Sequence, residues 1–319
     1  MSALISEKLF EEVLIKPALE GADTLLIVSG YASSAMVFHH LNKTSSNAFN
    51  VKLLVGMTPS HGLSETNHLG FRDIVENQSK GRLECSYLQT FPVHSKIYTW
   101  LKGGQPFRAF SGSANYSQNA FLKNYQREVC SEISPKSGKE YFESLIDSSI
   151  FCQNLEADFV LDKYKKSVPT DALFGSVSES PSEFNEESKV TISFINKSKI
   201  VSQRSGLNWG QRPELGREPN QAYIPVPMSI ARGTFFPDPR LHFTVNTDDG
   251  KLLICSRGQQ GGKAIQTPHN NSLFGEYFRS RLGLASGELV TRQHFQNYGR
   301  HTVDFYKVDE ENYFMDFSV

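Results

Sequence analysis

Apolar residues in the first half of the chain form short runs that alternate with longer segments of helical spacing. The runs of strand length lie at residues 24–29, 51–56, 83–88 and 127–133. The segments with one apolar face lie at residues 7–19, 33–41, 64–77 and 138–150, and Ser64 is a plausible N-cap. A hairpin is predicted from residues 94–101 and 108–111. Alternating strands and helices predict an α/β sheet.

The second half of the chain has a different pattern and is predicted to be mostly β. Its strands are expected at residues 191–195, 221–226, 241–245, 252–255, 302–308 and 313–317, with a helix at 272–282. Residues 176–188 between the halves are rich in Ser and Glu and nearly devoid of large apolar side chains, which is typical of a linker. We therefore expect a first domain at 1–168, a linker at 169–188 and a second domain at 189–319.

The hairpin carries four polar residues that are typical of a phosphate site. His94 and Lys96 are two residues apart on a strand and therefore point to the same face. Ser113 and Asn115 have the same spacing just after the next strand. Lysine offers a positive charge, serine and asparagine offer neutral donors, and histidine can act as a nucleophile or carry a proton. Each pair alone is common in half-exposed strands and turns, so the prediction depends on their combination.

Two segments of the second half have little core potential and carry side chains that can read base edges. They span residues 202–212 and 256–267, and the second is expected to be flexible. Ordinary polar surface loops would have the same composition, and that alternative stays open for each residue. The candidate DNA-binding residues are Arg204, Ser205, Asn208, Trp209, Gln211, Arg212, Arg257, Gln259, Gln260, Lys263 and Gln266.

Composition and charge fit a two-domain protein that binds a polyanion. The 319 residues are 39% hydrophobic and 12% aromatic, enough for two cores. From Lys189 onward there are 16 Lys and Arg against 12 Asp and Glu, a net charge of +4. Residues 1–188 have 17 Lys and Arg against 22 Asp and Glu, a net charge of −5. Four cysteines without C-x-x-C spacing favour reduced thiols in a bacterial cytoplasm. We find no signal peptide and no apolar run of roughly 18 residues, and so expect no membrane span.

The His94-x-Lys96 and Gly112-Ser113-x-Asn115 motifs resemble the half-motif of the phospholipase D superfamily. By this resemblance His94 is the nucleophile, Lys96 and Asn115 bind phosphate, Ser113 assists, and Glu128 orients His94. The Asp that usually follows the lysine by five residues is replaced by Leu101. The family uses two histidines, and this chain has one H-x-K motif. The resemblance therefore implies a homodimer whose two chains share one active site.

The run from Ser205 to Arg212, followed by residues 217–225, resembles the NgoFVII-type restriction endonucleases. These join a phospholipase D-like α/β nuclease domain to a mostly-β, plant B3-like pseudobarrel whose two arms enter the major groove, here about 199–212 and 257–267. The resemblance implies type II-like, metal-independent, sequence-specific cleavage of double-stranded DNA through a phosphohistidine, with no cofactor. It leaves open a separate ATP-dependent, helicase-like subunit and a cognate DNA methyltransferase.

Two other functions fit parts of the sequence. A phospholipase D-type lipid or nonspecific phosphodiesterase would use the same four polar residues, but it would have no need for a basic second half with polar arms. A DNA-binding regulator without catalytic activity would use the second half and only dimerise through the first. The sequence does not reveal the recognition site or the positions of cleavage.

Overall fold

The computed structural model describes residues 4–44, 49–123, 127–167, 189–196 and 198–319. The chain divides into two compact units, Met1–Leu173 and Phe174–Val319. The predicted linker at 169–188 lies outside the described residues.

The first unit is built on an eight-stranded sheet with the order β1-β7-β6-β5-β2-β3-β4-β8. Strands β2, β3 and β4 are parallel, and the remaining neighbours pair antiparallel. The strands are β1 (Leu4–Ile5), β2 (Thr24–Ser29), β3 (Asn50–Val55), β4 (Leu83–Leu88), β5 (Lys96–Lys102), β6 (Gln105–Gly112), β7 (Cys130–Ile133) and β8 (Ser149–Phe151).

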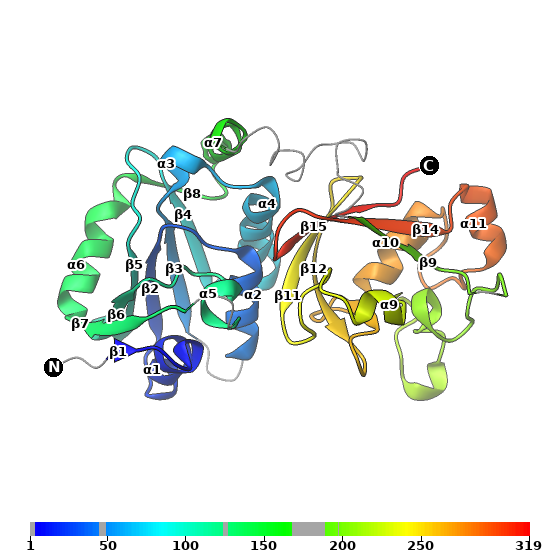
Figure 1. The fold of residues 1–319 in the computed structure, drawn as a ribbon, viewed down its shortest axis with the longest axis horizontal. Helices are drawn as coiled ribbons and strands as arrows, with labels where there is room; N and C mark the ends of the chain where they lie inside the picture. Colours follow the sequence, from blue (N-terminus) through cyan, green and yellow to red (C-terminus); the bar gives the residue numbers. More distant parts are fainter. Residues whose placement is uncertain (1–3, 45–48, 124–126, 168–188, 197) are drawn as a thin grey trace. The chain divides into compact units, whose positions relative to one another are not determined.

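Helices cover both faces of this sheet, with α6 on one face and α2 and α4 on the other (Figure 1). Burial on both faces explains why the central strands read as continuous apolar runs. The helices are η1 (Phe10–Ile15), α1 (Lys16–Leu19), α2 (Ser34–Lys43), α3 (Thr58–His61), α4 (Glu65–Asp73), η2 (Ile74–Gln78), α5 (Gln118–Phe121), α6 (Pro135–Ile146), η3 (Leu155–Asp158) and α7 (Phe159–Ser167).

Local sequence signals account for several element ends. The Ser33 and Ser64 side chains cap α2 and α4 by accepting hydrogen bonds from the backbone N–H of the third helical residue, Met36 and Asn67. Gly103 and Gly104 both have positive φ angles, as the tight turn between β5 and β6 requires. Several predicted boundaries differ from the structure: the strands expected at 127–133 and 221–226, for example, are Cys130–Ile133 and Ile224–Pro225. The helix expected at 138–150 ends at Ile146, because Ile150 is buried opposite Tyr87 in the pairing of β8 with β4.

The second unit is built on a seven-stranded sheet with the order β10-β13-β12-β11-β15-β14-β9. Neighbouring strands pair antiparallel except β11 with β15, which are parallel. The sheet is a nearly closed barrel, because its two edge strands, β9 and β10, approach each other. The strands are β9 (Lys189–Ser193), β10 (Ile224–Pro225), β11 (His242–Thr247), β12 (Leu252–Gly258), β13 (Ala264–Gln266), β14 (Thr302–Lys307) and β15 (Asn312–Asp316).

Aromatic side chains fill the interior of this barrel. Phe243, Phe305 and Tyr313 are buried and pack around Phe236, with ring centroids 5.3–5.7 Å from its ring. Phe243, Phe305 and Tyr313 lie on strands, where every second side chain points to the same face. The alternation of apolar residues in the sequence therefore directs these rings into the barrel. The helices of this unit are η6 (Gly206–Asn208), η7 (Pro213–Leu215), α9 (Met228–Ala231), α10 (Leu273–Arg281) and α11 (Arg292–Tyr298).

Candidate active site and nucleic-acid interface

Strand register brings the predicted catalytic residues to one edge of the first sheet. Strand β5 begins at Lys96, which lies opposite Ser29 at the end of β2. On its other side β5 pairs with β6, and the end of β6 lies opposite the start of β7 at Cys130. His94, Ser113, Asn115 and Glu128 therefore all belong to segments that enter or leave the sheet at the same edge, where α/β sheets place their sites.

His94 and Lys96 are in direct contact. The Lys96 Nζ lies 3.0 Å from the His94 Nε2 and donates to the His94 carbonyl at 2.7 Å. An ammonium can only donate, so the His94 Nε2 accepts and presents its lone pair on this side of the ring. His94 is exposed whereas Lys96 is buried. Burial lowers the pKa of Lys96, and the negative charge of Glu128 opposes that shift.

Gly30 provides the space that the His94 ring occupies. A Cβ atom at position 30 would lie 2.9 Å from the His94 Cδ2 and 3.3 Å from its Cα. The Gly30 N–H also donates to the Ser95 carbonyl at 3.1 Å, which joins the end of β2 to the residue between His94 and Lys96. The imidazole is thus held against the backbone, where a side chain at position 30 would displace it.

Asn115 is oriented by the backbone next to Gly30. Its Oδ1 accepts a hydrogen bond from the Tyr31 N–H at 3.2 Å. Because the amide oxygen is used in this way, the amide NH₂ is the part of Asn115 that can donate to an anion. The neighbouring Tyr116 is buried and its N–H donates to the Ser29 hydroxyl at 2.9 Å, so the loop after β6 is fastened to the end of β2.

Ser113 and Glu128 form a second pair at this edge. The Ser113 hydroxyl donates to the Glu128 carboxylate and accepts from the Val129 N–H at 3.1 Å. A Cβ at Gly112 would lie 1.9 Å from the Val129 carbonyl, so a glycine is required for this close approach. The structure therefore places Glu128 against Ser113 and near the charge of Lys96. Its role in orienting His94 stays a prediction from the family resemblance.

Two further residues at this edge were missed from the sequence. The Tyr31 ring meets the His94 ring edge-on, with centroids 5.7 Å apart, and lies parallel to the His61 ring at 5.9 Å. The Tyr31 hydroxyl is 2.5 Å from the His61 Nδ1, and burial raises the pKa of Tyr31. Tyr31 follows a predicted buried strand by two residues, and that position was the available signal for it.

A buried histidine supports the same loop from inside the unit. The His40 Nε2 lies 2.9 Å from the Leu14 carbonyl, which only accepts, so Nε2 carries the proton. The His40 Nδ1 then accepts from the Tyr116 hydroxyl at 2.8 Å. Burial lowers the pKa of His40 to about 4. The neutral ring thus holds Tyr116, the residue after Asn115.

The first predicted arm is anchored in the barrel more firmly than expected. Leu207 and Asn208 are buried, and Leu207 belongs to the core. The Asn208 amide donates to the Ser202 and Val290 carbonyls and accepts from the Val290 N–H at 2.7–2.9 Å. These three bonds engage the whole amide, so in this structure Asn208 fixes the base of the arm and does not face a ligand.

The other candidates of the first arm lie nearer the surface. Arg204 is exposed and pairs with Glu214, and Ser205 donates to the Ser202 hydroxyl at 2.5 Å. Trp209, Gln211 and Arg212 are half-buried. The Arg217 guanidinium lies 3.7 Å from the Trp209 ring centroid, and the Gln211 amide donates to the Gly287 carbonyl at 2.9 Å.

The second predicted arm is a β-hairpin with residues 259–263 at its turn. Ser256, Arg257 and Gly258 of β12 pair with residues 264–266 of β13, because the buried Ala264 and Ile265 continue the barrel. Arg257 is buried and its guanidinium donates to the carbonyls of residues 231, 237 and 262. This inward orientation of Arg257 does not fit the expected role of reading base edges. Gln259, Gln260 and Lys263 at the tip are exposed, and Gln266 is half-buried.

The described residues contain neither a candidate metal site nor a candidate membrane span. No group of three or more His, Cys, Asp or Glu side chains there is arranged to hold a metal ion. None of its helices has the length and apolar character needed to cross a membrane.

Comparison with family models matches both halves of the chain. Residues 7–158 match the NgoFVII restriction endonuclease N-terminal PLD domain. Residues 183–309 match the NgoFVII C-terminal B3-like DNA-binding domain. A search of curated proteins found no match.

Solved structures resemble parts of the chain at low sequence identity. NucT from Helicobacter pylori is 14% identical, covers 47% of this chain and 98% of its own, and has a TM-score of 0.35. The phospholipase D family member Nuc from Salmonella typhimurium is 12% identical, covers 47% and 95%, and has a TM-score of 0.35. A polyphosphate kinase from Porphyromonas gingivalis is 17% identical, covers 52% and 28%, and has a TM-score of 0.34.

Proposed function

The chain belongs to the NgoFVII restriction endonuclease family, and on this premise we propose that it cuts double-stranded DNA at a specific sequence through a phosphohistidine on His94. The two matched modules are a nuclease domain and a DNA-binding domain, so the enzyme is a hydrolytic nuclease whose partner is DNA. This assignment disfavours both a lipid phosphodiesterase and a regulator without catalytic activity. The observation that carries the proposed chemistry is the 3.0 Å contact between the Lys96 Nζ and the His94 Nε2.

In the proposed first step the Lys96 ammonium transfers its hydrogen bond from the His94 Nε2 to a phosphoryl oxygen, and the freed Nε2 lone pair attacks phosphorus. A P–N bond forms and the P–O bond to the leaving nucleotide breaks. His94 of the partner subunit enters protonated and gives its proton to the leaving oxygen. The chain has one H-x-K motif, and a single imidazole cannot be bonded to phosphorus and protonate the leaving group at the same time. A two-fold dimer supplies the second ring.

In the second step, His94 of the partner subunit, now neutral, removes a proton from water. The water oxygen attacks phosphorus, the P–N bond breaks and the first His94 is released. The products are a phosphate-ended strand and a hydroxyl-ended strand, with no net change in either imidazole. One shared site implies that the two DNA strands are cut one after the other.

Lys96 and Asn115 are suited to stabilise the charge that develops on the phosphoryl oxygens. Lys96 is buried next to the attacking ring, where its charge acts in a medium of low dielectric constant. The Asn115 oxygen is already used by the Tyr31 N–H, which leaves its NH₂ to donate. In the proposed mechanism these side chains from two subunits perform the charge stabilisation that a metal ion provides in many nucleases.

We further propose that residues 1–168 cut and dimerise while residues 189–319 read the sequence. The exposed tip residues Gln259, Gln260 and Lys263 and the surface residues of the first arm carry chemistry suited to base edges and phosphates. The four buried, unbridged cysteines fit a reducing cytoplasm.

Digestion of a plasmid of known sequence, followed by mapping of the ends, tests this function. We expect discrete fragments with a common sequence at their ends, in the presence as well as the absence of a strong chelator. Cutting that stops when the chelator is added would overturn the metal-independent mechanism. Ends scattered at random would overturn sequence-specific cleavage.

A further inference from the structure

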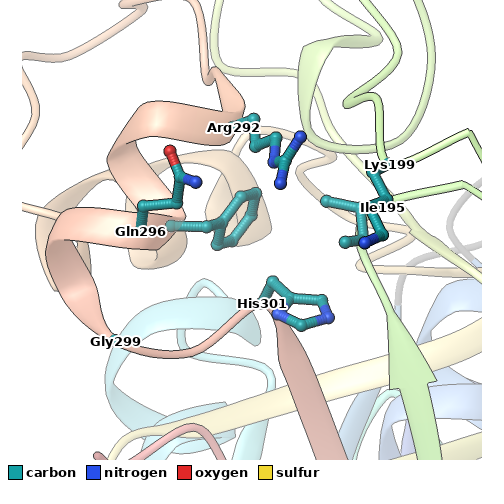
Figure 2. A pocket seen from close by; sticks show the side chains of 7 residues that line it. Ile195, Lys199, Arg292, Gln296, Gly299 and His301 are labelled. Atoms are coloured by element: carbon teal, nitrogen blue, oxygen red, sulfur yellow. The ribbon is translucent and has the colours of Figure 1, made fainter.

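The second unit contains a basic pocket between the end of β9 and helix α11 (Figure 2). Its volume is about 330 Å³. Figure 2 shows Arg292 and Gln296 on the helix side, Lys199 and Ile195 across from them, and His301 below. The lining residues are Ile195, Lys199, Arg292, Phe295, Gln296, Gly299 and His301.

The two positive side chains of this pocket are not neutralised by a carboxylate among the described residues, unlike several other cations of the unit. Arg281 pairs with Asp248 at 2.7 Å, and Arg300 pairs with Asp316 at 2.8 Å. Lys199 and Arg292, by contrast, form no ion pair with any described acidic residue, and no acidic residue lines the pocket. Two exposed cations, a glutamine amide and an imidazole therefore surround one cavity, and all four can donate hydrogen bonds.

The walls of the pocket are held in place by hydrogen bonds and ring packing within the unit. Lys199 has a φ of 58°, which non-glycine residues adopt rarely. The turn is fastened by Asn196, whose Oδ1 accepts from the Ser198 and Ile200 N–H groups at 2.9 and 3.0 Å. The opposite wall is anchored by Phe295, which is buried and stacks on Phe194 with centroids 5.5 Å apart. The two cations therefore project from anchored segments.

We propose that this pocket binds one phosphate of the DNA backbone beside the recognition sequence. This inference rests on the proposed function and adds a backbone-phosphate contact to the base reading proposed for the arms. A phosphate diester is small and anionic, and it accepts several hydrogen bonds at once, which matches paired Lys and Arg with neutral donors. Lys199 is also the first residue of the first arm, so a phosphate held there fixes the register of that arm on the duplex.

Salt-dependent binding provides the test. The full-length His94→Ala protein, which we expect not to cut, is titrated with a fluorescent 30-base-pair duplex pool of random sequence at several salt concentrations. Lys199→Ala and Arg292→Ala are each introduced, with Arg292→Lys as the charge-preserving variant. Lys136→Ala is the matched control, since Lys136 is an exposed lysine of the first unit with a side chain 81% exposed. Melting temperatures verify folding.

We expect each alanine variant to lower the slope of log affinity against log salt by about 0.9 and to weaken binding several-fold at low salt. Arg292→Lys and Lys136→Ala should retain the parent slope. Alanine variants that retain the parent slope and affinity would overturn the pocket's role while leaving the nuclease assignment intact. A parent protein that fails to bind any duplex would instead contradict the proposed function itself.

Discussion

The proposed catalytic edge of the first unit and the predicted arms of the second unit are built in opposite ways. At the edge, strand register and close backbone contacts at Gly30 and Gly112 bring functional side chains together. In the arms, the exposed candidates sit on turns, while Asn208 and Arg257 face inward and hold those turns. Chemistry needs groups fixed before the substrate arrives, whereas recognition needs side chains that protrude from a fixed base.

The largest effect that would separate these regions is loss of His94, the proposed nucleophile. His94→Ala should reduce cleavage by about 10⁴-fold or more, because no P–N bond can form, while DNA binding by the second unit is retained. Plasmid cleavage and gel shifts on the same preparation measure the two properties. If binding is lost together with cleavage, His94 has a structural role and the separation of the two regions does not hold.

A smaller loss is expected when the buried charge next to His94 is removed. Lys96→Met retains the length of the side chain but not its charge, and should slow cleavage by about 10²- to 10³-fold. Single-turnover rates at saturating enzyme isolate this effect from binding. The matched control is Lys102→Met at the other end of β5, which should leave the rate unchanged. Equal rates for Lys96→Met and the parent would contradict the assigned charge stabilisation.

Acid should destabilise the first unit through His40. The pKa of His40 is about 4 in the folded chain, below the ordinary value of 6.5, because the ring is buried. The unfolded chain therefore binds the proton first, and the free energy of unfolding falls as pH decreases from about 6.5 to 4. A shift of this size corresponds to about 3 kcal/mol.

The two tryptophans allow this loss to be measured in one unit. Trp100 lies in the first unit and Trp209 in the second, so Trp209→Phe makes fluorescence report on the first alone. Urea unfolding of that variant should show a pH dependence that shrinks when His40→Gln is added. An unchanged pH dependence would show that His40 is not its source.

The smallest predicted effects distinguish the inside of the arms from their tips. Asn208→Ala removes three hydrogen bonds made by a buried amide and should destabilise the second unit by about 1–3 kcal/mol. Gln260→Ala, at an exposed tip, should change stability by less than about 0.5 kcal/mol but reduce discrimination between cognate and altered DNA sites by about 1–3 kcal/mol. Thermal melting and competition binding measure these two quantities. The reverse pattern would contradict the assigned roles.

The same contrast explains how far the sequence could predict the structure. Apolar runs locate most of the sheet. The predicted strand begins at His94, whereas β5 begins at Lys96, so the contact between the two side chains comes from the segment that enters the strand and not from strand alternation. The inward orientation of Asn208 and Arg257 could not be predicted, since a polar residue in a polar loop looks the same whether it binds a carbonyl or solvent. The pairing of β8 with β4 and the contact of Tyr31 with His94 depend on distant segments.

The central claim is that two copies of His94 share one active site, and mixed dimers test it most directly. Parent and His94→Ala chains carrying different tags are co-expressed in equal amounts, and the plasmid-cutting rate is measured per total dimer. If both imidazoles are required, only parent dimers cut, and the rate falls to about one quarter of the parent rate. A rate of about one half would mean that each chain has its own complete site, and would contradict the account.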